Sequence, residues 1–297
     1  MAGIQGPTIR SEIGDLIEIL FTNKLTRNYA SIHSMGLAYS KENEGALYPN
    51  ATSSDPHVAP VRGDAVPPGE CVVYKWVVPE SSAPPPKEPA SMNGYHSYVS
   101  EAEDVFTGLI GPQMTYHRGK MNQTISKYRE FPILFLGFDE SSSFLSGVNA
   151  AALNSKTGNF STIPSDLFMY GNQSFWLPQL INVIDARNFD GAPTFQVVNG
   201  WVYSNNPTFT MCLNEDVIWY VYAYGTDSHV FHLHGNGVVQ HGINEVSVDI
   251  NDGIMATLFM QATNSGLWQL ICHITEHLQK GMVANYWVKD DCPPLKH

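Results

Sequence analysis

The sequence has few basic residues and lacks any long hydrophobic run. It contains 16 Lys and Arg against 28 Asp and Glu, so the formal net charge is −12. Nucleic acid and anionic lipid surfaces attract basic faces, and the composition therefore argues against both as partners. No apolar segment reaches about 18 residues, the length that a membrane-spanning helix needs. We expect a protein that binds neither nucleic acid nor membrane.

Cysteine is scarce, and none of its positions form a CxxC pair, which excludes a zinc knuckle or a thioredoxin-like site. The four cysteines are Cys71, Cys212, Cys272 and Cys292. The first residues also lack the basic and apolar regions of a signal peptide. Glycosylation sequons nevertheless begin at Asn50, Asn122, Asn159 and Asn172. We expect a secreted glycoprotein whose leader has been removed, with a cytoplasmic protein as the alternative.

Helical periodicity is weak throughout, and short β-rich runs alternate with Gly, Pro, Asn and Asp. These runs cover residues 16–21, 71–78, 131–137, 195–198, 217–224, 230–234, 256–261 and 267–271. A proline-rich stretch at residues 83–89 predicts an exposed loop. The pattern predicts an all-β protein built from sandwiches.

Two parts of the chain look like versions of one unit. Residues 14–21 resemble residues 214–221, and each stretch precedes a histidine-bearing strand. We therefore expect two tandem β-sandwich domains, residues 1–120 and residues 121–297.

The chain carries eleven histidines, and seven of them fall into tight clusters. These are His33, His96, His229, His232, His234, His273 and His277. Alternate residues of a strand point to opposite faces. Strand parity therefore places His229 and Cys272 on the inner side of the second domain, where His277 and Met282 can join them. The same strands present His232, His234 and His273 outward.

Two imidazoles, a thiolate and a weak axial thioether are the ligand set of a blue-copper site. The sequence offers this set as His229, Cys272, His277 and Met282. The peptide bond from Cys272 to His273 would link that site to a second metal site on the outer face.

The run from Cys272 to Met282, Cys-His-Ile-Thr-Glu-His-Leu-Gln-Lys-Gly-Met, resembles the copper motifs of multicopper oxidases. The flanking segments 6–15, 39–49, 107–112 and 139–143 are similar to the ceruloplasmin and hephaestin branch of that family. The resemblance covers nearly the whole chain and implies two cupredoxin-like, Greek-key sandwich domains. The family's first strands before Gly6 are missing, so the first domain is expected to be truncated.

The resemblance implies a complete type 1 copper site and an incomplete trinuclear site. In the family, eight histidines in four His-x-His pairs hold three copper ions. Five of these positions are histidine here, namely His33, His96, His232, His234 and His273. The other three are Met35, Tyr98 and Ile271, of which Met35 and Tyr98 are candidate altered ligands. We expect one type 1 copper and one or two further copper ions, with reduction of dioxygen to water impaired.

The implied activity is that of a copper-dependent oxidoreductase, with Cys272, His273 and Glu276 as the catalytic residues. A small organic reductant, of a phenolic or secondary-metabolite class, would deliver electrons near His277 under the insertion at residues 139–190. Gln196 stands where ceruloplasmin-type iron sites have histidine, so ferroxidase activity is disfavoured. The alternatives are an electron-transfer protein and a structural pseudo-oxidase without turnover.

The family also implies a disulfide and an assembly. Cys212 and Cys292 match a family disulfide, which leaves Cys71 as a buried thiol. Two domains cannot close the family's six-domain ring, but three copies can, because heterologous contacts that close form a ring. We therefore expect a homotrimer with copper between its subunits.

Overall fold

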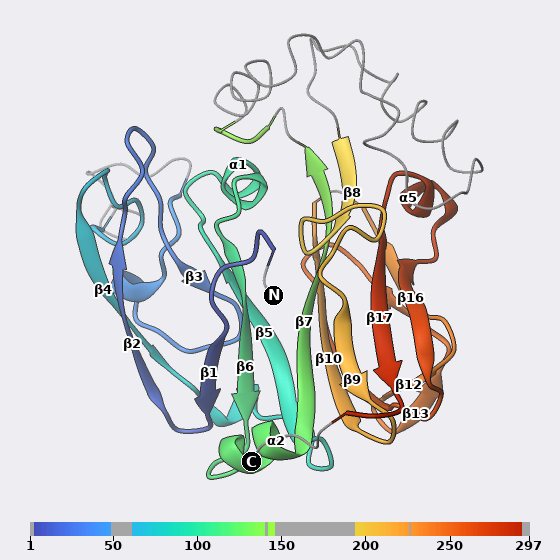
Figure 1. Ribbon diagram of the computed structural model, residues 1–297. Coiled ribbons are helices and arrows are strands. Elements are labelled where there is room, and N and C mark those ends of the chain that lie inside the picture. The colour runs from blue at the N-terminus through green and yellow to red at the C-terminus, as the bar shows by residue number, and fades with distance from the viewer. Residues whose placement is uncertain (1–2, 49–60, 140–141, 146–193, 226, 293–297) are drawn as a thin grey trace, which may run out of the picture.

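The computed structural model describes residues 3–48, 61–139, 142–145, 194–225 and 227–292. Within these residues strands predominate and the helices are few and short, as the sequence predicts, and two sandwiches lie side by side (Figure 1). No helix in the described part of the chain is long and apolar enough to cross a membrane. Three of the four sequons and most of the insertion at residues 139–190 lie outside the described residues.

The first sandwich consists of two sheets. One has the order β1-β6-β5-β3 and the other pairs β2 with β4. The strands are β1 (Ile9–Glu12), β2 (Leu16–Thr22), β3 (His33–Ser34), β4 (Cys71–Val77), β5 (Ala90–His96) and β6 (Ile110–Tyr116). Short helices η1 (Lys41–Asn43), η2 (Glu80–Ser82) and α1 (Glu101–Phe106) lie between them. Tyr74 and Trp76 are fully buried between the two sheets.

The second sandwich follows α2 (Met121–Lys127) and has sheets of the order β13-β12-β15-β10-β7-β8 and β14-β11-β16-β17-β9. The first sheet contains β7 (Tyr128–Asp139), β8 (Thr194–Val198), β10 (Asp216–Tyr224), β12 (Val238–Gln240), β13 (Ile243–Glu245) and β15 (Met255–Gln261). The second contains β9 (Phe209–Cys212), β11 (His229–Leu233), β14 (Ser247–Ile250), β16 (Gly266–Cys272) and β17 (Val283–Lys289), with α5 (Thr275–Gln279) before β17. All eight predicted strands are present.

Strand β10 explains how the two sandwiches join. Other strands and sheets cover both of its faces. Because both faces are buried, its sequence is a nearly unbroken apolar run. Trp219 and its alternate neighbours face the core of the second sandwich. Tyr220, Tyr222 and Tyr224 face a second core that β5 and β6 of the first sandwich complete. The sandwiches therefore share buried apolar surface.

A buried carboxylate reinforces this junction. Glu130 of β7 accepts hydrogen bonds from the hydroxyls of Tyr116 (2.8 Å) and Tyr220 (2.6 Å). Arg10 of β1 forms an ion pair with the same carboxylate at 2.9 Å. Because a buried charge is tolerated only when it is paired and hydrogen-bonded, these contacts fix β1 and β6 against β7.

The predicted disulfide is present, whereas the predicted burial of the remaining free thiol is wrong. Cys212 and Cys292 form the expected disulfide. Cys71 is exposed rather than buried. It begins β4 opposite Thr22 of β2, and strand alternation puts it on the solvent face with Val73 and Val77.

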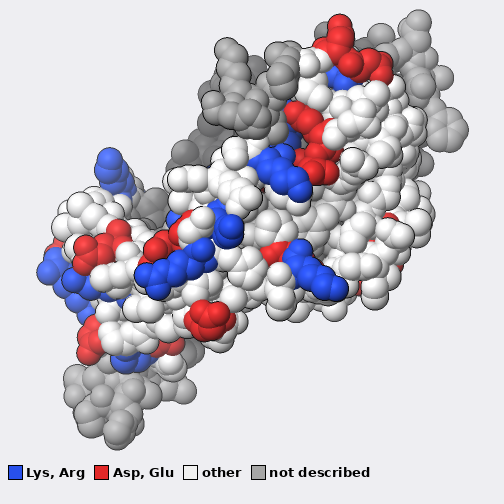
Figure 2. Space-filling model, turned by 90° about the horizontal axis from the view of Figure 1, so that it is seen from below, with Lys and Arg blue, Asp and Glu red and all other residues white. Residues whose placement is uncertain are grey.

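The face that carries α2 is mixed in charge, with acidic and basic side chains interspersed (Figure 2). Ion pairs at the starts of β7 and β10 join Lys127 to Asp216 at 3.3 Å and Arg129 to Glu215 at 2.6 Å. Opposite charges therefore neutralise one another here.

Candidate metal centre

The predicted type 1 ligands come from the ends of two neighbouring strands and from the segment that follows them. His229 begins β11 and Cys272 ends β16, and these strands are antiparallel with Phe231 opposite Cys272. His277 lies in α5, and Met282 immediately precedes β17. The backbone N–H of Cys272 donates to the carbonyl of Met282 at 3.1 Å, so the loop folds back over the cysteine.

Gly281 makes that return of the chain possible. Its φ is +108°, and a Cβ there would lie 2.9 Å from the Cβ of Val202. Only glycine accepts this conformation without strain at such a close approach. The turn places the fully buried Met282 in the same core as Cys272.

Three donor atoms converge in this core. Cys272 Sγ lies 3.5 Å from His277 Nδ1 and 3.8 Å from His229 Nδ1, and the two nitrogens are 3.2 Å apart. All three residues are buried. Within the described residues, this is the one group of three or more His, Cys, Asp or Glu side chains close enough to share a metal ion.

The separations fit a single ion. If the metal–nitrogen bonds are about 2.0 Å long and the metal–sulfur bond about 2.3 Å, these donor separations correspond to angles of roughly 105–125° at the metal. Such angles lie between tetrahedral and trigonal, which suits a site with a weak axial ligand. The thiol sulfur also accepts a hydrogen bond from the backbone N–H of Val230 at 3.4 Å.

Burial favours the neutral forms of the two imidazoles and of the cysteine thiol in the absence of metal. Desolvation, followed by the nearby His277 ring, lowers the pKa of His229 to about 4. Burial likewise lowers the pKa of His277 and raises the pKa of the Cys272 thiol. Neutral imidazoles are ready to bind metal, while binding at Cys272 releases a proton.

The lowered pKa of His229 predicts acid sensitivity of the metal-free protein. The unfolded chain binds a proton near pH 6.5 and the folded chain only near pH 4, so stability falls as pH decreases through this window. We expect a loss of about 2 kcal/mol in the free energy of unfolding at pH 5 relative to pH 7. Urea unfolding with a chelator present measures it. A His229→Gln variant should show a smaller pH dependence, and an equal dependence in both proteins would contradict the prediction.

His232, His234 and His273 lie on the outer face of the same sheet, as strand parity predicts. The His232 ring centroid lies 5.3 Å from that of His234 and 5.1 Å from that of His273. His232 Nδ1 lies 2.6 Å from the carbonyl oxygen of Val246, which leaves Nε2 free for a metal. Opposite His232 in the sheet stands Ile271, at a position where the family has histidine.

His33 and His96 form a separate group in the first sandwich. They are register partners on β3 and β5, with ring centroids 5.7 Å apart. Tyr98 lies beside both rings, whereas Met35 packs into the core between the sandwiches and accepts a hydrogen bond from the Tyr224 hydroxyl. Among the described residues, no ring contact joins this group to the outer histidines of the second sandwich.

A partly exposed carboxylate that the sequence reasoning missed lies beside Nε2 of the buried His277 ring. Asp227 Oδ2 lies 3.7 Å from His277 Nε2 and accepts a hydrogen bond from Gln196 Nε2 at 3.2 Å. Glu276, the predicted catalytic acid, is exposed and pairs with Lys280 at 2.5 Å. Asp227 stands two residues before His229, and this Asp-x-His spacing is the signal that could have indicated it.

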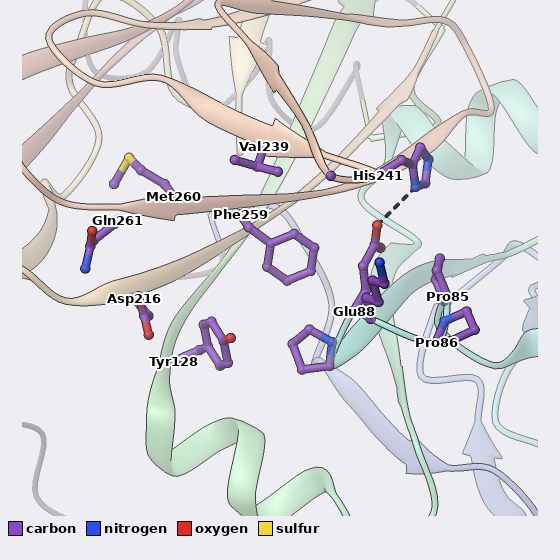
Figure 3. A pocket seen from close by; sticks show the side chains of 13 residues that line it. Pro85, Pro86, Glu88, Tyr128, Asp216, Val239, His241, Phe259, Met260 and Gln261 are labelled. Carbon is purple, nitrogen blue, oxygen red and sulfur yellow. Dashed lines mark hydrogen bonds and ion pairs between the residues drawn. The ribbon is translucent and has the colours of Figure 1, made fainter.

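A separate cavity of about 720 Å³ lies between the proline-rich stretch and the second sandwich (Figure 3). Tyr128 and Phe259 line it, and His241 Nδ1 lies 3.1 Å from the buried carboxylate of Glu88. The buried Glu88 shows that residues 83–89 are not simply the exposed loop that was expected. None of the predicted copper ligands is among its lining residues.

Comparisons with known proteins indicate a family. The family model "Multicopper oxidase" matches residues 175–291, which include all four predicted type 1 ligands. The chain is a homologue of the multicopper oxidases. It is 32% identical to "Ferroxidase HEPHL1" of Homo sapiens over 98% of this chain and 23% of that protein, and 32% identical to "Hephaestin" of Mus musculus over 99% and 24%. "Ceruloplasmin" of Homo sapiens is 28% identical over 96% and 25%.

Solved structures support the cupredoxin-like fold. A blue copper oxidase from Nitrosomonas europaea matches with a TM-score of 0.62 at 17% identity, over 97% of this chain and 77% of that one. A copper nitrite reductase from the same organism matches with a TM-score of 0.63 at 15% identity, over 98% and 85%. The chain spans about a quarter of the length of the curated relatives, and the family implies copper as the metal.

The comparisons do not support the prediction that ferroxidase activity is unlikely, because two similar relatives are named ferroxidases. The prediction rested on Gln196 in place of histidine. The Asp227 carboxylate accepts a hydrogen bond from Gln196, so an acidic side chain does lie beside the candidate metal centre.

Proposed function

We propose that the chain is a copper-dependent oxidoreductase that takes electrons from a small reductant at a type 1 copper. Its ligands would be His229, Cys272, His277 and Met282. The observation that carries the proposal is the buried convergence of one sulfur and two nitrogens within 3.2–3.8 Å of one another. When bound, copper supplies one-electron redox chemistry, while the protein excludes water and orients the ligands.

The outer histidines provide the exit for electrons. Cys272 is buried and the adjoining His273 is exposed beside His232. A single peptide unit therefore connects the inner site to the outer group. We propose that this group and the His33–His96 group hold one or two further copper ions, where dioxygen or a substrate would be activated.

The separation of the two groups supports the assembly that the sequence predicts. One chain presents His33 and His96 from the first sandwich, and His232, His234 and His273 from the second. We propose a homotrimer in which the first group of one subunit faces the second group of its neighbour. In this arrangement each subunit contributes two cupredoxin domains, residues 1–120 and residues 121–297.

Two classes of reductant fit different observations. A small organic reductant, such as a phenol, suits the surroundings of His277, where Gln196 stands in the position of a histidine. Ferrous iron is favoured by the partly exposed Asp227, whose carboxylate lies beside Nε2 of His277, and by the exposed Glu276. Lys280 neutralises Glu276, so Asp227 is the stronger candidate for a cation contact.

Substrate oxidation by the copper-loaded protein and by an Asp227→Asn variant separates these classes. If the reductant is organic, a phenol is oxidised and ferrous iron is not. If it is iron, the substitution raises KM for iron at least roughly tenfold, because a charge pair near 4 Å is worth about 1 kcal/mol per unit charge even in water. Loaded protein that oxidises neither would contradict the oxidoreductase and favour an electron-transfer protein. Protein that binds no copper would favour a pseudo-oxidase.

We also propose a place in the secretory pathway. The disulfide between Cys212 and Cys292 is typical of oxidising compartments. Asn122, the first residue of the one sequon among the described residues, is exposed in α2.

A further inference from the structure

The rings of His33, His96 and Tyr98 form a nearly equilateral triangle in the first sandwich. Their centroids are 5.7 Å apart for the two histidines, 5.6 Å for His33 and Tyr98, and 5.7 Å for His96 and Tyr98. The register of β3 and β5 sets His33 against His96. Tyr98 follows two residues after His96 and is held by a bridge to Ala46, so a strand-like backbone brings it to the same side.

Both histidines are oriented as metal ligands usually are. His33 Nδ1 lies 2.7 Å from the carbonyl oxygen of Glu44, and His96 Nδ1 lies 2.9 Å from that of Ser97. A carbonyl can only accept, so Nδ1 carries the proton in each ring and Nε2 keeps its lone pair. Each ring thus has its orientation fixed by backbone and its outer nitrogen free.

Oxygen-bearing side chains lie near these rings. The Glu101 carboxylate Oε1 lies 3.9 Å from His96 Nε2. Tyr98 brings a phenol to the same triangle. Two imidazoles bound at about 2 Å have ring centroids roughly 5 Å apart, close to the observed spacing. Two imidazoles and a phenol offer nitrogen and oxygen donors, a set that suits Cu²⁺.

The other altered residue does not join this set. Met35 is engaged by the Tyr224 hydroxyl and packs in the core between the sandwiches. The donors that surround the triangle therefore all belong to residues 33–101 of one chain.

We propose that His33, His96 and Tyr98 form a mononuclear Cu²⁺ site within a single chain, in which Tyr98 binds as a phenolate and Glu101 adds negative charge beside His96 without binding the metal. Binding releases the phenolic proton to solvent and involves no electron transfer. The inference rests on the proposed function only for the identity of the metal. It differs from a site shared between subunits because it needs no ligand from a neighbour.

The test uses the full chain with Cys272→Ser, which removes the blue absorption of the type 1 site. On titration with Cu²⁺ we expect a visible phenolate-to-copper charge-transfer band. Adding Tyr98→Phe should abolish the band, while His33→Ala should remove both the band and its copper. The matched control is Tyr39→Phe, because the Tyr39 ring lies 5.8 Å from His33 but outside the triangle. That variant should keep the band.

His273→Ala in the same background tests whether a neighbour contributes, and we expect the band to persist. Its loss there, its survival in Tyr98→Phe, or its absence from folded Cys272→Ser protein would overturn the proposal. If Cys272→Ser does not fold, the spectrum of loaded wild type minus that of Tyr98→Phe reports the same band. Failure of the type 1 site is seen separately, as a missing blue band in wild type.

Discussion

Replacing Cys272 with serine abolishes the intense blue absorption of the copper-loaded protein and reduces its copper content by one ion per chain. The thiolate is the ligand that gives such a site its character, and a hydroxyl does not replace it. Substrate oxidation should fall by more than roughly 100-fold, since even changes to residues behind the ligands cost 10- to 100-fold. Visible absorption, copper analysis and steady-state kinetics on the same preparation measure the three effects.

Cys71→Ser is the matched control, because Cys71 is also a free thiol but lies exposed on β4. It should keep the blue band and the copper. A Cys272→Ser protein that remains blue would show that the thiolate ligand has been assigned to the wrong residue.

Removing the disulfide is expected to have the largest effect on stability. Cys212 and Cys292 are 80 residues apart, and a cross-link of that span restricts the unfolded chain strongly. The loop-entropy relation predicts that Cys292→Ser lowers the free energy of unfolding by about 4.5 kcal/mol. Urea unfolding of the metal-free protein measures this change.

A reducing agent provides the control for the disulfide prediction. It should destabilise the wild type by a similar amount and leave Cys292→Ser unchanged. A loss below about 1 kcal/mol in the variant would mean that packing of β9 against β17 holds these ends together without the bond.

The strands could be predicted from sequence because β-branched and aromatic runs bounded by turn residues carry a local signal. The way the sandwiches join could not be. Trp219 and Tyr220 are both buried in β10, and sequence alone does not show that their opposite faces enter different cores. That outcome depends on which sheets cover β10.

The convergence of the candidate inner ligands was largely predictable because strand parity and a short spacing determine it. His229 and Cys272 alternate with outward residues on neighbouring strands, and His277 follows within one short helix. Asp227 was missed because its role arises from a tertiary contact with Gln196, far away in sequence. The exposed Cys71 was missed because the prediction took a leftover thiol as buried without following the alternation along β4.

The two altered positions of the outer site also needed the structure. Met35 and Tyr98 are equivalent in sequence terms, since each replaces a histidine of the family pattern. Packing separates them, because β10 supplies Tyr224 against Met35 and leaves Tyr98 beside His33 and His96. Sequence spacing does not contain that information.

The most direct test of the central claim is electron paramagnetic resonance of wild-type protein reconstituted with copper, together with its visible spectrum and copper count. We predict one blue type 1 copper per chain, with the narrow copper hyperfine splitting of a thiolate site, and one or two further copper ions. A folded protein that binds copper but shows neither the blue band nor the narrow splitting would contradict it.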